Sequence, residues 1–549
     1  MTDYDAIIIG SGAGGGVAAG VLAEAGKHVL LLERGRAYRY EEVGRDHVRN
    51  HRLSVYGHNT GPELEGNPRV FVSAGGTARV VRPHEGGWHN NAMAVGGGTR
   101  VFGAQAWRFM PQDFRMAGLY GVPEGSSLGD WPIGYDDLAP YYERAEWEVG
   151  VSGDGAADRH AGPRTRPYPM PAVPDNPQRL LLQRAAERLG WNTTPVPLLI
   201  NTVPYNGRPP CVRCGSCVGF ACPSEGKNGP HNTLIPRALA TGRCRLVTGA
   251  MVEKVETDAR GRVTGVSYFT DDDDETGTPR RRTARAKAVV VSCGAIESAR
   301  LLLNSPSTRE PRGLGNGHDQ VGRHLQGHYY PTAFGLTEEA NYDGNGPGVS
   351  IATCAFNHGN PGVIGGAMLA NDFIELPVLF WKWHWPPGLP RWGLAAKRFM
   401  RDGYRRGVQV KGPVQEIPSP ESRVTVDRSV RDRWGIPVAR LSGTTHPETL
   451  RTADLMRQRA EQWLRAAGAD RAWGRPPALQ LSAGQHQAGT CRMGDDPRSS
   501  VTDRWGRVHG HDNLFVVDGA LHVTNGGFNP VLTILALAFR SAEHIARNV

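Results

Sequence analysis

The chain has 549 residues, of which 39% are hydrophobic and 21% are charged. This length is sufficient for two or more domains with large cores, and the composition is ordinary for a globular protein. The net charge of +9 comes from arginines scattered along the chain and from no long basic block, so we do not expect a nucleic-acid-binding protein.

The sequence begins with "MTDYDAIIIG", which lacks a basic segment followed by a cleavage site, and it contains no apolar run of about 18 residues. We therefore expect no signal peptide, no transmembrane segment and a cytoplasmic location. Eight cysteines in a protein of this kind do not indicate a disulfide framework.

Residues 4–35, "YDAIIIGSGAGGGVAAGVLAEAGKHVLLLERG", predict a β-α-β unit. Ile7-Ile8-Ile9 predict a short buried strand, and residues 17–25 predict a helix that ends before Gly26. The apolar run "HVLLLE" predicts a second buried strand. This is the context in which a glycine-rich turn binds a dinucleotide.

Gly10, Gly12 and Gly15 form a G-x-G-x-x-G motif at this turn. Gly10 permits the tight turn, Gly12 lets a pyrophosphate approach the backbone, and Gly15 lets helix and strand pack closely. Glu33 follows about twenty residues on, where a carboxylate binds a ribose 2′-hydroxyl and would repel the 2′-phosphate of NADP. The pattern favours a dinucleotide site over a ligand-free turn, but it does not choose between FAD and NAD.

A second glycine-rich segment, "AVGGGTRVFGAQAWRF", covers residues 94–109. Gly96, Gly97 and Gly98 would let the backbone lie close to a flat ligand, and the alternative interpretation is a surface turn.

Residues 245–258 and 262–271 predict paired strands. The blocks "DDDDE" at 271–275 and "RRRTAR" at 280–285 predict a solvated loop. The segment "AKAVVVSCGAIESARLLLNS" then predicts a strand, a glycine turn and a helix. Because this α/β pattern returns some 250 residues after the first unit, we expect a discontinuous nucleotide-binding domain.

The last forty residues complete the α/β pattern. They predict a strand at 514–517 and a long helix that begins at Pro530, preceded by Asn529 at a capping position. The positive end of this helix would suit a flavin ring that becomes anionic on reduction.

The chain resembles the glucose–methanol–choline (GMC) oxidoreductases almost from end to end. The resemblance rests on five motifs in the family's order: "IIIGSGAGGG" with Glu33, "AVGGGTRV", "AKAVVVSCGAIESARLLL", "HQAGTCRMG" and "VVDGALHVTNGGFNPVLTILALA". It implies an α/β (α+β overall) fold, in which a Rossmann-like FAD-binding domain joins a substrate domain with a large antiparallel sheet.

The domain boundaries that we expect follow from this resemblance. The FAD-binding domain would comprise residues 1–155, 225–325 and 480–549. The substrate-binding domain would comprise residues 156–224 and 326–479.

The resemblance also implies the catalytic residues. The family's histidine lies in H-x-x-G-T-x-x-M-G, which is His486 here, and its partner before the proline of the last helix is Asn529. A neutral imidazole would take the hydroxyl proton of an alcohol, and an amide would donate a hydrogen bond to the developing alkoxide. The alternative role for His486 is packing, and His522 and His328 are the other candidates for the base.

The cofactor that we expect is non-covalently bound FAD. Fungal pyranose oxidases of this family link FAD to a histidine in the second glycine-rich segment, where this chain has Val101. The residues expected to contact FAD are Gly10, Gly12, Gly15, Glu33, Gly97, Gly98, Val252, Gly294, Asp518, Gly519 and Pro530.

Within the family the chain most resembles pyranose oxidases and bacterial glucoside 3-oxidases. It is therefore expected to oxidise a secondary hydroxyl of a pyranose or glycoside, at C2 or C3, with oxygen or a quinone as the electron acceptor. The alternatives are an iron–sulfur-containing sugar or alcohol dehydrogenase that passes electrons to a partner, and a non-catalytic flavin-binding redox module.

Four cysteines bear on that choice: Cys211, Cys214, Cys217 and Cys222. Their C-x₂-C-x₂-C-x₄-C spacing favours a folded loop with thiols or a local disulfide, so we expect no metal. An iron–sulfur cluster and a zinc ion are the alternative occupants.

The aromatic segment "FWKWHWPPGLPRW" at 380–392 has two interpretations. Its tryptophans would pack a core or a lid, or they would stack on sugar rings or lie on a membrane surface.

Overall fold

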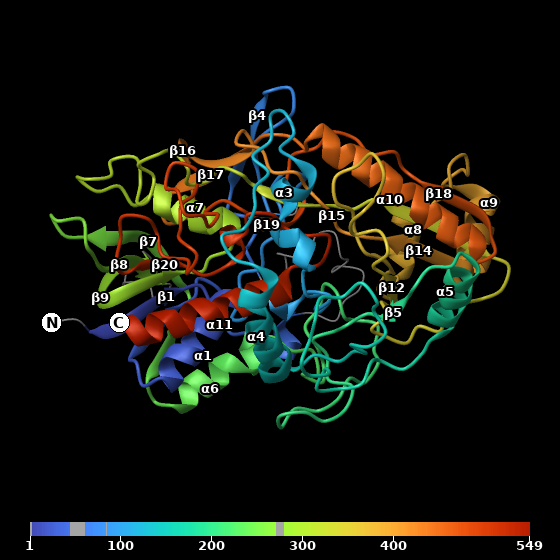
Figure 1. The fold of residues 1–549 in the computed structure, drawn as a ribbon, viewed down its shortest axis with the longest axis horizontal. Coiled ribbons are helices and arrows are strands. Elements are labelled where there is room, and N and C mark those ends of the chain that lie inside the picture. The colour runs from blue at the N-terminus through green and yellow to red at the C-terminus, as the bar shows by residue number, and fades with distance from the viewer. Residues whose placement is uncertain (1–2, 44–60, 84, 271–278) are drawn as a thin grey trace.

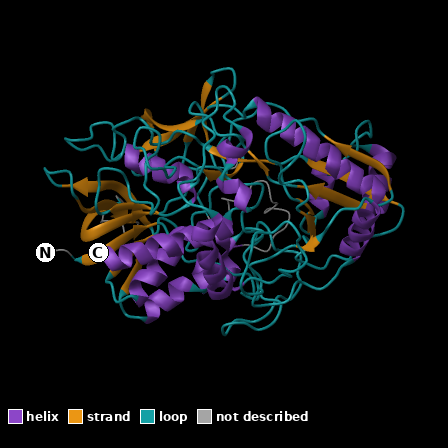
Figure 2. Ribbon diagram, viewed as in Figure 1, coloured by secondary structure: helices purple, strands orange, loops and turns teal. Residues whose placement is uncertain are grey.

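The structure is a computed structural model that describes residues 3–43, 61–83, 85–270 and 279–549 (Figure 1). The acidic block at 271–275 lies outside these ranges. Figure 2 shows two regions of regular structure, with loops and short strands between them. No helix in the described ranges is both long and apolar enough to cross a membrane.

The first region is built on a seven-stranded sheet with the order β6-β2-β1-β9-β8-β7, in which β20 also pairs with β9. The strands are β1 (Tyr4–Ile9), β2 (Val29–Leu32), β6 (Cys244–Val247), β7 (Ala250–Thr257), β8 (Val263–Thr270), β9 (Arg280–Val291) and β20 (Leu514–Val516). β6, β2, β1, β9 and β20 pair in parallel, whereas β7, β8 and the start of β9 pair antiparallel. Strands β1 and β20, which lie more than 500 residues apart in the sequence, thus share one sheet, which confirms the predicted α/β fold class.

Helices pack closely on this sheet because small residues line their contacts. The helices are α1 (Ala13–Glu24), α6 (Leu234–Ala240), α7 (Ala295–Leu303) and α11 (Val531–Asn548). α1 contacts both α6 and α11, at the lower left of Figure 1. A Cβ at Gly16 would lie 2.2 Å from Pro230 and one at Gly20 would lie 3.0 Å from Leu234, so glycine permits these contacts.

The prediction of a loop over "RRRTAR" was wrong. Residues 280–285 form the first half of β9 and pair antiparallel with β8. Arg281 is exposed and bonds Glu253 of β7, while Ala284 is buried. Arg281 and Arg285 therefore lie on the solvent-facing side of a strand, and pairing with β8 determines the conformation of this segment. The predicted strand at 245–258 is divided in two, because β6 pairs with β2 whereas β7 pairs with β8.

The second region is a six-stranded antiparallel sheet with the order β18-β11-β14-β13-β12-β5. Its strands are β5 (Thr194–Pro195), β11 (Thr332–Thr337), β12 (Ile351–Thr353), β13 (Leu369–Asn371), β14 (Gly407–Lys411) and β18 (Ala469–Gly474). One face packs against α10 (Pro447–Ala466), which also contacts α5 (Pro177–Arg188).

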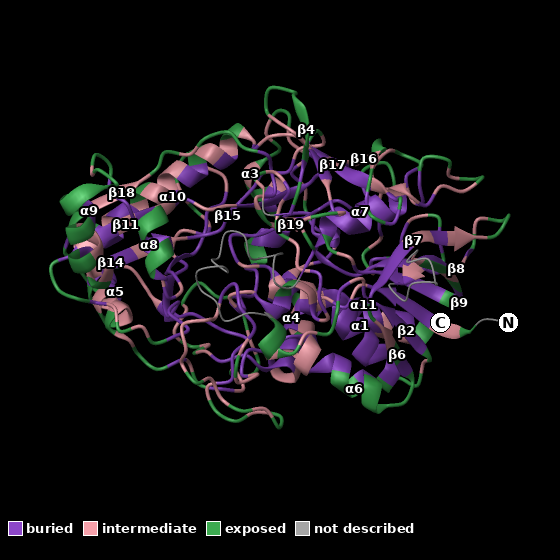
Figure 3. Ribbon diagram, turned by 180° about the vertical axis from the view of Figure 1, so that it is seen from behind, coloured by how far each residue is buried: buried purple, intermediate pink, exposed green. Residues whose placement is uncertain are grey.

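The aromatic segment begins in the second half of α8 (Pro377–Trp383) and continues as a loop to α9 (Gly393–Arg398). Phe380, His384 and Trp385 are buried, and His384 lies against Phe334 of β11. Trp392 is 81% exposed. Both helices lie at the outer end of the molecule, where Figure 3 shows mostly exposed and intermediate residues. This segment therefore combines core packing with exposed tryptophans.

Two smaller sheets complete the described strands. The first, β15-β10-β19, is antiparallel and consists of β10 (Gln326–Tyr329), β15 (Val414–Gln415) and β19 (Gln485–Ala488). The second, β16-β17-β3-β4, consists of β3 (Arg69–Val72), β4 (Ala78–Val81), β16 (Arg423–Arg431) and β17 (Pro437–Ser442).

The remaining helices are short. They are α3 (Met116–Tyr120), α4 (Tyr135–Ala145), η1 (Tyr40–Val43), η2 (Gly97–Arg100), η3 (Pro111–Phe114), η4 (Glu146–Gly150), η5 (Pro230–Asn232), η6 (Phe399–Gly403), η7 (Tyr404–Arg406) and η8 (Gly519–Leu521).

Candidate active site

An open cleft of about 1130 Å³ lies at the carboxyl ends of the parallel strands. This is the edge of an α/β sheet at which ligands bind. The cleft is lined by nine of the eleven residues expected to contact FAD: Gly10, Gly12, Glu33, Gly97, Gly98, Val252, Gly294, Asp518 and Gly519. The other two, Gly15 and Pro530, lie outside the lining.

The three glycines of the first motif occupy three different environments. Gly10 has a φ of +94°, and a Cβ there would lie 2.3 Å from the carbonyl oxygen of Ser292. A Cβ at Gly15 would lie 1.9 Å from the carbonyl oxygen of Gly10, so Gly15 serves helix packing. A Cβ at Gly12 would meet nothing within 4 Å, because Gly12 faces the cleft.

The cleft has the shape and the donors for a dinucleotide. Added Cβ atoms at Gly12, Gly98 and Gly294 would point into open space, so the backbone is bare where a ligand would approach. The N-terminus of α1 lies at this edge, where its free N–H groups suit a pyrophosphate. Glu33 is buried at the end of β2 and accepts hydrogen bonds from Ser11 and Gly35.

Asp518 lies where β20, α7 and η8 meet. Its carboxylate accepts hydrogen bonds from the backbone N–H groups of Gly294 and Ala520 and from the Ser298 hydroxyl. Burial raises the pKa of Asp518, whereas these hydrogen bonds lower it. Asp518 thereby joins two segments that line the cleft.

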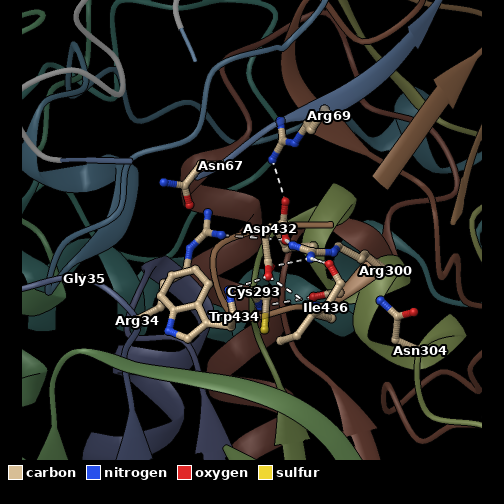
Figure 4. Close-up of polar contacts among 12 residues, drawn as sticks. Arg34, Gly35, Asn67, Arg69, Cys293, Arg300, Asn304, Asp432, Trp434 and Ile436 are labelled. Atoms are coloured by element: carbon tan, nitrogen blue, oxygen red, sulfur yellow. Dashed lines mark hydrogen bonds and ion pairs between the residues drawn. The ribbon is translucent and has the colours of Figure 1, made fainter. Parts of the chain in front are cut away.

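A buried ion network closes the Glu33 end of the cleft (Figure 4). Glu297 of α7 contacts Arg69 at 2.7 Å, Arg300 at 3.0 Å and Arg34 at 3.7 Å. Arg300 also binds Asp432 at 2.6 Å. Burial opposes ionisation of Glu297, but the three guanidinium groups hold its pKa well below the ordinary value. Sequence reasoning did not identify this network, since it joins residues from four distant segments.

The β16–β17 turn reaches the same end of the cleft. Asp432 accepts hydrogen bonds from the backbone N–H groups of Trp434 and Ile436, and Ile436 lines the cleft. Arg300 donates further hydrogen bonds to the carbonyl oxygens of Ile436 and Pro437. Asp432 and Arg300 together fix this turn beside the cleft.

His486 and Asn529 lie together next to the cleft, outside its lining. The amide nitrogen Nδ2 of Asn529 is 3.5 Å from Nε2 of His486 and 3.2 Å from the Tyr330 hydroxyl. Gln487, the next residue after His486, lines the cleft beside Gly519. Asn529 Oδ1 is buried and has no hydrogen-bond partner among the described residues. The two residues predicted to be catalytic thus face one another.

The protein holds His486 in an uncommon conformation. Its φ of +55° is in the left-handed region. This backbone conformation is energetically unfavourable for a residue other than glycine, and such residues cluster at functional sites. Asn525 donates a hydrogen bond to its carbonyl oxygen at 2.9 Å. Removal from water and the nearby Lys411 ammonium lower the pKa of His486 to about 4. The imidazole is therefore neutral near neutral pH and able to accept a proton.

Two neighbours of His486, Tyr330 and Lys411, did not emerge from the sequence as site residues. A third neighbour, His328, was predicted only as an alternative base. His328 Nδ1 lies 3.0 Å from His486 Nδ1, and the Tyr330 hydroxyl lies 3.5 Å from it. Lys411 Nζ lies 5.7 Å from the centre of the Tyr330 ring. His328 lies on β10, Tyr330 directly follows that strand and Lys411 ends β14, so the pairing of strands within the 326–479 range and with β19 brings them to His486.

Polar groups continue from Lys411 across the same sheet. Lys411 pairs with Asp372 at 2.7 Å, and Gln409, two residues earlier on β14, donates a hydrogen bond to the same carboxylate oxygen. The other oxygen, Oδ1, is buried without a hydrogen-bond partner in the ranges that the structure covers. Asp372 and Gln409 line a second, polar pocket of about 470 Å³.

The predicted alternative base His522 lies behind the site. It is fully buried, packs against Phe109 and Trp131, and its Nδ1 lies 2.8 Å from Asn525 Oδ1. His522 therefore supports Asn525.

The four clustered cysteines line one small pocket together with Lys227, whose ammonium donates hydrogen bonds to three backbone carbonyls. All four are free thiols, and burial raises the pKa of Cys217 and of Cys211. In the part of the chain that the structure describes, no three histidine, cysteine, aspartate or glutamate side chains are arranged to hold a metal ion.

The sheet, the dinucleotide cleft and the histidine–asparagine pair define a nucleotide-dependent oxidoreductase. Residues 69–330 match the N-terminal domain of the GMC oxidoreductase family, and residues 418–538 match its C-terminal domain. The chain belongs to this family and is an FAD-dependent oxidoreductase, which excludes the interpretation as a non-catalytic module.

Relatives of known name cover the whole chain. It is 32% identical over 550 residues to 6'''-hydroxyparomomycin C oxidase of Streptomyces lividus, covering 100% of this chain and 92% of that protein. It is 28% identical over 565 residues to the fructose dehydrogenase large subunit of Gluconobacter japonicus, covering 99% and 98%. The crystal structure of pyridoxine 4-oxidase from Mesorbium loti has the same fold, with a TM-score of 0.62, 18% identity and coverage of 99% of both chains.

Proposed function

We propose that this enzyme oxidises a secondary hydroxyl of a pyranose sugar or glycoside, at C2 or C3, to a ketone. The observation that carries the proposal is the contact between His486 and Asn529 next to Gln487, which lines the cleft. Asn529 Oδ1 and Asp372 Oδ1 are buried acceptors without hydrogen-bond partners among the described residues. A polyhydroxylated substrate offers the donors that such acceptors need.

The chemistry requires a proton and a hydride to leave one carbinol. When bound, FAD supplies the acceptor for the hydride. His486 takes the hydroxyl proton on its imidazole, whose lowered pKa keeps it unprotonated. Asn529 and Tyr330 lie beside it as hydrogen-bonding groups that orient the substrate oxygen.

Lys411 has an electrostatic role in this proposal. Its ammonium lies near Tyr330 and favours negative charge that develops on the substrate oxygen. The same charge disfavours protonation of His486 before the substrate arrives. Asp372 holds Lys411 in place from the other side.

The names of the relatives support a sugar-like substrate, since one is an oxidase of 6'''-hydroxyparomomycin C and another a fructose dehydrogenase. We propose oxygen or a quinone as the acceptor. The rival proposal is a dehydrogenase that passes electrons to a partner through a metal centre at Cys211, Cys214, Cys217 and Cys222, which line one small pocket as free thiols.

The test is anaerobic reduction of the bound flavin by a panel of monosaccharides and glycosides, with the position of the product carbonyl read by NMR. Rapid bleaching with a ketone at C2 or C3 is expected. A primary alcohol oxidised to an aldehyde, or bleaching by simple alcohols alone, would contradict the proposal. Iron and sulfide in stoichiometric amounts would favour the dehydrogenase.

A further inference from the structure

His328 and His486 meet across the three-stranded sheet. His328 lies on β10 and His486 on β19, and His328 pairs in register with Gln485, the residue before His486. The two Nδ1 atoms are 3.0 Å apart, and the rings are nearly perpendicular at 78°. His328 is 1% exposed, so water does not compete for this contact.

The surroundings of His328 determine which of its nitrogens carries hydrogen. Its Nε2 lies 2.8 Å from the carbonyl oxygen of Gly526, which only accepts hydrogen bonds, so Nε2 is the donor. Burial lowers the pKa of His328 well below the ordinary value, and the ring is therefore neutral. A neutral imidazole has one N–H, which leaves Nδ1 of His328 as an acceptor.

The tautomer of His328 determines the tautomer of His486, because the two Nδ1 atoms contact one another. Because Nδ1 of His328 carries a lone pair, Nδ1 of His486 must supply the hydrogen at 3.0 Å. Nε2 of His486 then carries the lone pair, and it is Nε2 that faces Asn529. The position of Asn525 supports this arrangement. Its amide nitrogen, which is a hydrogen-bond donor, lies 3.4 Å from Nδ1 of His328, so that Nδ1 is the acceptor.

We propose that His328 is a positioning residue that fixes the reactive tautomer of His486. The inference rests on the proposed function and adds to it the atom that receives the proton. The substrate O–H bond breaks, its proton bonds to Nε2 of His486, and the Nδ1–H of the resulting imidazolium remains donated to His328. Gly526, His328, His486 and the substrate hydroxyl thus form one directional chain of hydrogen bonds.

The tautomer matters because the left-handed backbone of His486 and its tether to Asn525 fix the ring. A hydrogen on Nε2 would face Asn529 and the substrate as a donor, and the base would be absent. Without an acceptor at Nδ1, both tautomers become available.

Two substitutions separate this role from packing. His328→Gln keeps an amide oxygen to accept from His486 and an amide nitrogen to donate to Gly526. His328→Leu fills a similar volume but removes both groups. His384→Leu is the matched control, because His384 is also fully buried and bonds a backbone carbonyl at 3.0 Å, but it contacts Glu375 and Phe334 and not His486.

Stopped-flow reduction of the flavin by a substrate from the panel gives the limiting rate and the substrate dissociation constant. We expect His328→Leu to lower the limiting rate about 10- to 100-fold, the range for partners that orient an imidazole. The dissociation constant should remain unchanged, His328→Gln should recover most of the rate, and His384→Leu should keep it. Equal losses in the Leu and Gln variants, or a loss confined to the dissociation constant, would overturn the proposal.

The acidic limb of the pH profile reports the pKa of His486, and it distinguishes a lost hydrogen bond from a loosened core because the two shift this pKa in opposite directions. An acceptor at Nδ1 stabilises the imidazolium, so its removal lowers the pKa of His486 further. Water entering a loosened site would raise that pKa toward the ordinary value. The other ionisable groups near His486 are unchanged in these variants. They are Lys411 with its partner Asp372, and the buried Glu416, which accepts hydrogen bonds from the backbone of Gly327 and Ala483 and whose pKa burial raises to about 7.

His486→Ala distinguishes failure of this inference from failure of the proposed function. If His486→Ala loses the reductive step while His328→Leu keeps it, the positioning role is wrong and the base remains. If His486→Ala itself reduces its flavin at the wild-type rate, the proposed base is wrong, and the role of His328 falls with it.

Discussion

His486 is the side chain on which proton removal depends in the proposed reaction, and Asn529 is its nearest catalytic neighbour. We expect His486→Ala to lower the rate of flavin reduction about 10²–10⁴-fold, the value of a positioned general base. Asn529→Ala should cost about 10²–10³-fold, as the loss of one hydrogen-bond donor to a developing charge does. Anaerobic stopped-flow measurements isolate this half-reaction.

The amount of FAD bound per protein is the control measurement for both variants. Neither His486 nor Asn529 lines the cleft itself, so the flavin absorbance per protein should remain at the wild-type level. If His486→Ala reduces its flavin at the wild-type rate, His486 is not the base, and His522 or His328 becomes the candidate to test. Equal losses in reduction and reoxidation would indicate general damage to the site.

The lowered pKa of His486 predicts the acidic limb of the pH profile. A general base acts when unprotonated, so the rate rises with pH through the pKa of that base. Burial and Lys411 place this pKa at about 4, compared with 6.5 for an exposed imidazole. We expect kcat/KM to fall on the acidic side near pH 4, and Lys411→Met should move the limb upward. An acidic limb centred at 6.5 in the wild type would contradict this assignment.

At the scale of elements, the β16–β17 turn is the part of the fold that holds the Glu33 end of the cleft closed. Asp432→Asn keeps an oxygen for the backbone N–H groups of Trp434 and Ile436 but removes the charge that binds Arg300. We expect FAD affinity to fall about tenfold, which corresponds to about 1.4 kcal/mol. The measurement is the recovery of free-flavin fluorescence after dilution.

Asp427→Asn is the matched control for this prediction. Asp427 lies in the same hairpin, where it bonds Ser429 and Arg440 away from the cleft. Its substitution should leave the rate of flavin release unchanged. The same release rate in the Asp432 variant and the wild type would show that the turn does not retain FAD.

Elements with strong local signals were predictable from the sequence. The β-α-β unit at residues 4–35 and the strand and helix after residue 286 are present, because apolar runs and glycine turns act locally. The first helix covers Ala13–Glu24 and thus begins before the predicted start at Val17. The helix predicted from Pro530 begins one residue later, at Val531. "RRRTAR" was misinterpreted because its conformation comes from β8, about 15 residues away, and not from its own charge.

The residues that surround His486 and Asn529 were harder to predict from the sequence. His486 and Asn529 are marked by motifs, whereas His328 reaches His486 through strand pairing across 158 residues. Lys411 ends β14 and Asp372 directly follows β13, and no local pattern specifies the register of these two strands. The domain boundaries and the roles of the individual site residues stay predictions.

At the scale of the whole molecule, the cofactor cleft draws on segments from residue 9 to residue 534. A ligand that binds the folded state and not the unfolded chain stabilises the protein by about 2.7 kcal/mol at a hundredfold excess over its Kd. We expect the melting temperature to rise with added FAD after the cofactor has been removed. A melting temperature independent of FAD would mean that the cleft forms no such ligand site.

The same cleft predicts that FAD is held without a covalent bond. Val101 has an aliphatic side chain and is 2% exposed, and no histidine is among the described residues that line the cleft. Cys293 lines it, but burial raises the pKa of its thiol, which keeps the group protonated and a poor nucleophile. Acid precipitation should therefore release the yellow colour into the supernatant. Colour that stays with the precipitated wild type and is released from Cys293→Ser would identify a thioether link and overturn this prediction.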